Sequence, residues 1–125
     1  MKKNKVKIIA SSKSQSAQEI DNLFIKKTIE WFFSRYPEIE SLCISVSITN
    51  NLKKSWDSVT QHDPRTYHIE VSSEIRTIKT LVETLLHECV HIYQWVTNEW
   101  EGDGEEEAIR ESSTLVNLIW AEGII

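Results

Sequence analysis

One long amphipathic segment, residues 74–97, constrains the fold of this chain more than any other feature. Its apolar side chains recur every three or four positions, which is the period of an α-helix with one buried face. These side chains are Ile78, Leu81, Val82, Leu85, Cys89, Ile92, Tyr93 and Val96. We therefore expect a long helix here, with one continuous face packed against the rest of the domain.

Two more helices are predicted, one before and one after this segment. Residues 17–36 carry apolar side chains at helical spacing, and Pro37 ends that helix because proline cannot continue it. Gly102-Asp103-Gly104 forms a flexible break after the long segment. Residues 105–121 then form the last helix, whose acidic first turn suits the positive end of the helix dipole. The break lets the chain reverse, so the last helix can pack on the long one.

A small sheet is predicted between the first helix and the long one. Residues 42–49 and 66–72 alternate apolar and polar side chains, as half-buried strands do. Weaker strand signals occur around residues 56–60 and 6–10. The order helix, sheet, helix, helix predicts an α+β domain rather than a βαβ alternation. Its sheet is expected to be small, about three-stranded and mostly antiparallel.

Length and composition indicate a single domain over residues 1–125, with 1–16 as a loosely ordered lead-in. The formal net charge of −5, from 19 acidic and 14 basic residues, gives no basic footprint for nucleic acid or an anionic membrane. No apolar stretch approaches the length of a membrane span, and residues 6–10 are too short for a signal-peptide core. A cytoplasmic location is therefore expected, and no pattern sets an oligomeric state.

Two histidines on the long helix form the strongest chemical signal. His87 and His91 stand four positions apart, so their imidazoles project from one face and can bind one tetrahedral metal ion, typically zinc. Glu88 lies about a quarter-turn round the helix. From there its carboxylate can take a proton from water at the metal. Cys89 points toward the apolar stripe and is expected in the core; it forms no CxxC pair with Cys43.

A catalytic zinc needs a third protein ligand and one open position. No histidine follows His91, so the candidates are the acidic residues Glu99, Glu101, Asp103, Glu105, Glu106, Glu107 and Glu111. Glu107 is favoured because Ala108 beside it allows close approach to the long helix, and Glu106 and Glu111 are the main alternatives. Glu111 shares a helix face with Glu107 and is expected to accept a hydrogen bond from a zinc-bound histidine.

These residues resemble the gluzincin group of zinc metallopeptidases. His87-Glu88-Cys89-Val90-His91 matches HExxH, and Glu107-Ala108-Ile109-Arg110-Glu111 looks like the acidic partner motif on the following helix. The resemblance implies two histidine ligands, Glu88 as general base, Glu107 as third ligand and Glu111 as a support for a histidine. The strand and Leu-rich helix before Tyr93-Gln94 are similar to those of SprT-like and minimal phage-type metallopeptidases.

Two departures limit this resemblance. SprT-like proteins usually use a third histidine, and many carry a C-terminal zinc ribbon that anchors them to DNA; neither is found after His91 here. A DNA-linked role is therefore not expected. In gluzincins the strand before the HExxH helix often edges the cleft and pairs with the substrate backbone. Residues 66–71 are its counterpart here, and Tyr67 and His68 on this strand are weaker candidates for contacts with substrate or an oxyanion.

The expected function is that of a zinc-dependent metallopeptidase acting on a peptide or protein substrate, with Zn²⁺ as cofactor. One alternative is a zinc hydrolase of a non-peptide bond. Another is a non-catalytic zinc-binding interaction module, whose site Glu101, Asp103 or Glu106 would close with a fourth ligand. An interaction protein without metal is the remaining alternative. Glu88 argues mildly against a structural site, because such a site needs no base.

Overall fold

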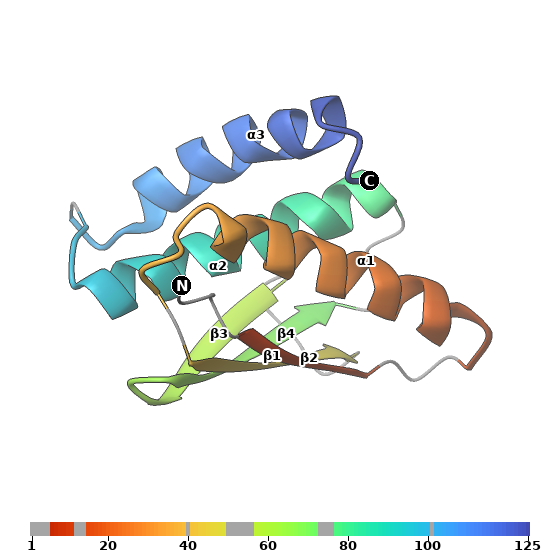
Figure 1. The fold of residues 1–125 in the computed structure, drawn as a ribbon, viewed down its shortest axis with the longest axis horizontal. Coiled ribbons are helices and arrows are strands. Elements are labelled where there is room, and N and C mark those ends of the chain that lie inside the picture. The colour runs from red at the N-terminus through yellow and green to blue at the C-terminus, as the bar shows by residue number, and fades with distance from the viewer. Residues whose placement is uncertain (1–5, 12–14, 40, 50–56, 73–76, 101) are drawn as a thin grey trace.

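The computed structural model describes residues 6–11, 15–39, 41–49, 57–72, 77–100 and 102–125. The elements in these residues are β1 (Val6–Ser11), α1 (Gln15–Ser34), β2 (Leu42–Thr49), β3 (Asp57–Asp63), β4 (Thr66–Ser72), α2 (Ile78–Thr97) and α3 (Glu105–Ala121). The predicted α+β class is confirmed. A helix near the N-terminus, a small sheet and two helices near the C-terminus follow each other in the expected order (Figure 1).

The sheet differs from the expected mostly antiparallel arrangement. Its strand order is β1-β2-β4-β3, and both the β1–β2 and the β2–β4 pairs are parallel. Only the hairpin partners β3 and β4 run antiparallel. For the β1–β2 pair the cause is the crossover through α1, which returns the chain in the same direction and makes β1–α1–β2 a βαβ unit. The sheet is small, as expected, but it has four strands and mixed pairing where about three strands, mostly antiparallel, were predicted.

The starts of two helices also correct the sequence-based expectation. Within the expected lead-in of residues 1–16, β1 pairs with β2 and α1 already begins at Gln15. The long helix α2 begins at Ile78 rather than near residue 74, and residues 73–76 lie outside the described part of the chain. Thr77 is its N-cap: the Thr80 backbone N–H donates to the Thr77 side chain over 3.1 Å. Capping satisfies a backbone donor that the helix leaves unpaired.

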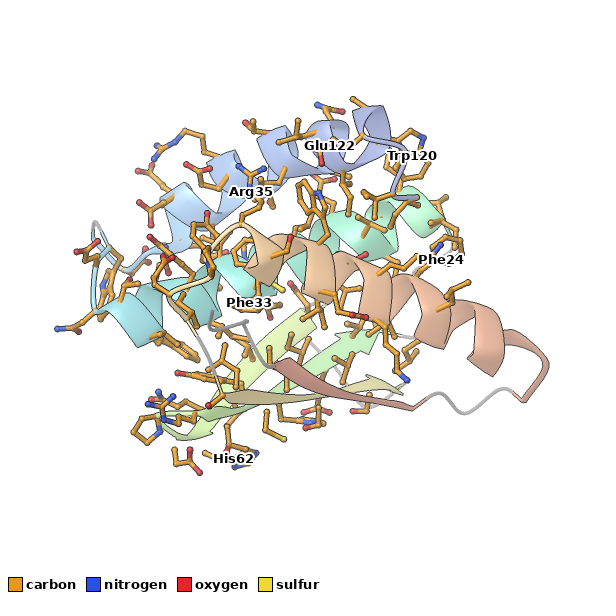
Figure 2. The ribbon with its side chains drawn as sticks, in the orientation of Figure 1. Phe24, Phe33, Arg35, His62, Trp120 and Glu122 are labelled. Atoms are coloured by element: carbon orange, nitrogen blue, oxygen red, sulfur yellow. The ribbon has the colours of Figure 1, made fainter. Side chains whose placement is uncertain are left out.

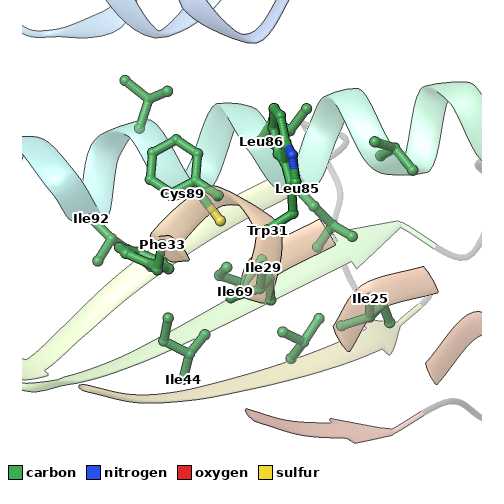
Figure 3. Packing of buried hydrophobic residues seen from close by; sticks show 14 of the residues in the cluster. Ile25, Ile29, Trp31, Phe33, Ile44, Ile69, Leu85, Leu86, Cys89 and Ile92 are labelled. Carbon is green, nitrogen blue, oxygen red and sulfur yellow. The ribbon is translucent and has the colours of Figure 1, made fainter. Parts of the chain in front are cut away.

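The helices are stacked in two layers on one face of the sheet. Helices α1 and α2 lie over the sheet, and α3 lies on α2 (Figure 1). Figure 3 shows the core between these layers, formed by Leu85, Leu86, Cys89 and Ile92 of α2 with Ile25, Ile29 and Phe33 of α1 and Ile44 and Ile69 of the sheet. Burial raises the pKa of the Cys89 thiol, and the expected core position of this residue is confirmed.

The far end of α3 is tied to α1 by a polar contact. The Trp31 indole Nε1 donates a hydrogen bond to Glu122 Oε1 over 2.9 Å, and the Arg35 guanidinium lies 5.2 Å from the centre of the Trp31 ring. Figure 2 labels Arg35 and Glu122, which directly follow α1 and α3 in the chain. With this end fixed, the first turn of α3 lies beside the C-terminal half of α2. No helix in the described residues is long and apolar enough to cross a membrane.

Candidate metal centre and cleft

The two histidines of α2 lie together, as their spacing predicts. The rings of His87 and His91 meet edge to face, with centroids 4.9 Å apart and an interplanar angle of 80°. Their side chains are 16% and 12% exposed, so each imidazole reaches the surface only at its edge. Glu88 between them is buried. One ligand atom from each of these three residues lies within 4.8 Å of the others, an arrangement that can hold a metal ion.

A single carboxylate contacts both imidazoles. Glu105 Oε1 lies 2.8 Å from His87 Nε2, and Glu105 Oε2 lies 3.1 Å from His91 Nε2. Glu105 is the first residue of α3, and its backbone N–H donates to Asp103 Oδ1 over 3.0 Å. The turn that leads to it contains left-handed residues at Asn98, Gly102 and Gly104. This turn reverses the chain, as the glycine break predicts, and points Glu105 back at α2.

The structure does not bring Glu107, the predicted third ligand, to the histidines. Glu107 Oε1 accepts a hydrogen bond from Gln94 Nε2 over 2.7 Å. Together with Glu111 it lines a separate cavity of about 470 Å³, whose other walls are Phe32, Tyr36, Val90, Tyr93, Glu99, Trp100 and Leu115. Residues two positions apart on a helix point roughly 200° away from each other. If Glu105 faces the histidines, Glu107 must therefore face away, and Glu111 lies with it. Glu101 lies outside the described residues.

The side chain of Gln94 contacts the Nδ1 atom of His91. This contact was not predicted from the sequence. His91 Nδ1 lies 2.9 Å from Gln94 Oε1. Gln94 is buried, although glutamine is rarely so. Gln94 is three residues after His91, so both side chains lie on one face of α2. This spacing could have indicated the contact from the sequence.

Aromatic stacking supports His91 from the side of the sheet. The ring of His91 stacks on Trp95, and Trp95 stacks on Tyr67, with centroid distances of 6.3 and 6.0 Å. Tyr67 is fully buried. Its hydroxyl donates to the Pro64 carbonyl over 3.1 Å and accepts from Gln61 Nε2 over 2.9 Å. Trp95 thus lies between Tyr67 and His91.

His68 points to the sheet face opposite the helices. Its Nδ1 lies 2.6 Å from Ser45 Oγ and its Nε2 lies 3.1 Å from Ser47 Oγ, both on β2. The alternation along β4 explains this, since Tyr67 and Ile69 on either side of it are buried under the helices. The structure therefore does not bring His68 to the histidine pair. His62 lies on β3 below the helices (Figure 2).

The cleft beside the histidines is bordered by β3, not by β4 as expected. Strand β4 lies between β2 and β3, whereas β3 is at the end of the strand order. A cavity of about 430 Å³ is lined by Asp57, Ser58 and Val59 of β3, His87, Glu88, His91 and Trp95 of α2, and Asp103 and Glu105. An edge strand leaves backbone donors and acceptors available for another strand.

Several carboxyl groups lie close together in the cleft. Burial, followed by the charges of Asp57 and Glu105, raises the pKa of Glu88 to about 8. Burial also raises the pKa of Asp57, while His87 acts in the opposite direction. Among the described residues, the cavity lining contains four carboxyl groups and no lysine or arginine. Two imidazoles and a carboxylate in such a setting are suited to a divalent cation such as zinc.

No family model matches this chain, and no curated protein or solved structure matches it significantly. Any function must therefore be inferred from the side chains that surround His87 and His91.

Proposed function

We propose that this protein is a zinc-dependent metallopeptidase in which His87, His91 and Glu105 bind the ion and Glu88 is the general base. The observation that carries this proposal is the approach of one carboxylate to both imidazoles, with oxygen–nitrogen distances of 2.8 and 3.1 Å. Two histidines and one glutamate form a ligand set known for catalytic zinc, which leaves one position open.

The spacing of these three groups suits an ion. Metal–ligand bonds of 2.0–2.1 Å in a tetrahedron put neighbouring ligand atoms about 3.3 Å apart. The two distances at Glu105 are only a few tenths of an ångström shorter than this. The Glu105 side chain is 51% exposed, so it can rotate outward slightly at little cost in packing. Its position at the start of α3 also leaves the β3 side of the cleft open to a substrate.

In this proposal Glu88 transfers the proton. When bound, zinc supplies Lewis acidity toward a substrate carbonyl and makes water a better nucleophile at neutral pH. Glu88 lines the same cleft as both histidines, and its carboxylate can accept a proton from the attacking water and donate it to the leaving amine. The positive charge of the ion opposes the burial of Glu88 and favours its ionised form.

The edge strand supports a peptide as the substrate. Asp57, Ser58 and Val59 of β3 line the cleft beside the histidines, and the outer edge of β3 faces away from β4. An extended peptide can add to such an edge through backbone hydrogen bonds. This would bring a backbone carbonyl along the cleft without requiring a deep side-chain pocket.

A non-catalytic zinc site is the second candidate, because Asp103 lines the same cleft and would supply a fourth ligand. The contact of Asp103 Oδ1 with the Glu105 backbone N–H opposes this, since it already engages one of the two carboxylate oxygens. Zinc binding without peptide cleavage by the wild-type protein would favour this candidate.

Metal content tests the ligand set directly. We expect about one zinc per chain in the wild-type protein by elemental mass spectrometry, and loss of the metal in His91→Ala and Glu105→Ala. Glu106→Ala is the matched control, because it removes a neighbouring exposed carboxylate of the same helix turn. A wild-type protein that takes up no zinc after reconstitution would overturn the metal site. Tight zinc binding by Glu105→Ala would overturn only the choice of third ligand.

A further inference from the structure

The amide of Gln94 can have only one orientation. Its Nε2 donates to the Gly104 carbonyl over 3.0 Å and to Glu107 Oε1 over 2.7 Å. Both partners are acceptors, so the NH₂ group must face them, and the carbonyl Oε1 must face His91 Nδ1. Gln94 is 1% exposed, so water does not compete for these contacts.

This orientation fixes the hydrogen on His91. An amide oxygen only accepts, so His91 Nδ1 must carry the hydrogen and donate it. A neutral imidazole has a single N–H, and Nε2 is then left with a lone pair. That lone pair faces Glu105 Oε2 over 3.1 Å, and a carboxylate oxygen is also an acceptor. Two acceptors that face each other need a positive charge between them. Either a second proton on the ring, which makes an imidazolium–carboxylate pair, or a metal ion supplies it.

We infer that Gln94 is a positioning residue that holds His91 in its Nδ1–H tautomer, with Nε2 free for the metal, and that Gly104 makes this possible. The inference rests on the proposed metal site. Its geometric basis is that a single buried amide contacts His91 on α2 and both Gly104 and Glu107 at the start of α3. The same amide therefore also sets where α3 begins, and so where Glu105 lies.

Gly104 leaves the space that Gln94 occupies. It has a φ of +82°, and a Cβ added there would lie 2.5 Å from Gln94 Oε1, closer than side-chain carbons come to such an atom. Its own carbonyl accepts from the amide. An alanine at this position would push the amide oxygen away from His91, in addition to the strain of a left-handed residue.

The tautomer can be measured without any metal. In metal-free protein, at a pH high enough to keep the imidazole neutral, long-range ¹H–¹⁵N NMR should show His91 as the Nδ1–H tautomer. Gln94→Leu should lose this preference. An Nε2–H tautomer in the wild type would overturn the inference even if zinc binds. An Nδ1–H tautomer in a protein that binds no zinc would leave the positioning role intact and overturn the proposed function instead.

Zinc affinity provides a second test that does not depend on Gln94→Leu folding. Gly104→Ala should weaken zinc binding by about 10- to 100-fold in competition with a chelating dye, as loss of a ligand's hydrogen-bond partner does. Gly102→Ala is the matched control, because Gly102 also has a positive φ but its added Cβ would meet nothing within 4 Å. Equal affinities of the two variants would overturn the role of Gly104, since both carry the backbone strain.

Discussion

Glu88 lies in an environment that disfavours the ionised form of its carboxyl group. Glu88 is only 3% exposed. The negative charges of Asp57 and Glu105 act on its carboxyl group. A protein does not bury an ionisable carboxyl group for stability, because desolvation of the charged form is costly. Such a group in a cleft beside two histidines is consistent with the general base of the proposed function.

Replacement of Glu88 by its isostere separates binding from chemistry. Glu88→Gln keeps the shape of the side chain but cannot take up a proton, so we expect retained zinc and a loss of peptide cleavage of about 10²- to 10⁴-fold. Digestion of a proteome-derived peptide library, read by mass spectrometry, measures this loss. Glu83→Gln, five residues earlier on α2 and not among the residues that line the cleft, is the control. Unchanged cleavage by Glu88→Gln would rule out its role as base.

The sequence could predict the part of the site that lies on one helix. His87, Glu88 and His91 follow from helical periodicity alone, because positions four apart share a face. The contacts of Glu105 with the histidines, and those of Gln94 with Gly104 and Glu107, could not be predicted in this way. They depend on how the turn after α2 sets the rotation of α3, and a shift of two residues exchanges Glu105 for Glu107. The spacing of residues in the sequence does not determine how one helix is rotated relative to another.

At the scale of elements, local patterns predicted which segments form strands but not how they pair. Strands β2 and β4 were expected from their alternation. The position of β3 at the cleft depends on β4 pairing with β2, which is a contact between distant parts of the chain. The β1–β2 pairing is likewise non-local. Alternation of apolar and polar residues indicates which face of a strand is buried. It does not indicate which other strand pairs with it.

The N-cap of α2 contributes to the stability of the helix that carries the site. Thr77→Ala removes the acceptor for the Thr80 N–H and should lower the free energy of unfolding by about 1 kcal/mol. Thr114→Ala, at an exposed position within α3, should be neutral or slightly stabilising because alanine is a better helix former. Urea unfolding followed by circular dichroism compares the two. Equal effects would mean that Thr77 does not act as a cap.

At the scale of the whole molecule, stability comes from one continuous apolar layer. Side chains of α1 and α2 meet those of the sheet there, and α3 adds its own buried face against α2. The cleft lies at the margin of this layer, where β3 and the first turn of α3 flank the end of α2. Core and site are thus built on the two faces of the same helix.

Substitution of two leucines tests this description of the core. Leu85→Ala, at a fully buried position on α2, should lower the free energy of unfolding by about 2–5 kcal/mol, because it leaves a cavity. Leu23→Ala on α1 should change it by less than about 0.5 kcal/mol, because that side chain is 51% exposed. Urea denaturation measures both. A similar cost at the two positions would contradict the assigned core.

The turn between α2 and α3 gives the proposed metal a second consequence. His91 and Glu105 are only 14 positions apart in the chain, so an ion held by both would close the intervening segment into a ring. As with a covalent cross-link, ring closure restricts the open forms of that segment more than it strengthens the folded one. The ion would then hold the segment between His91 and Glu105 closed. Its release would let this segment open while the apolar layer stays folded.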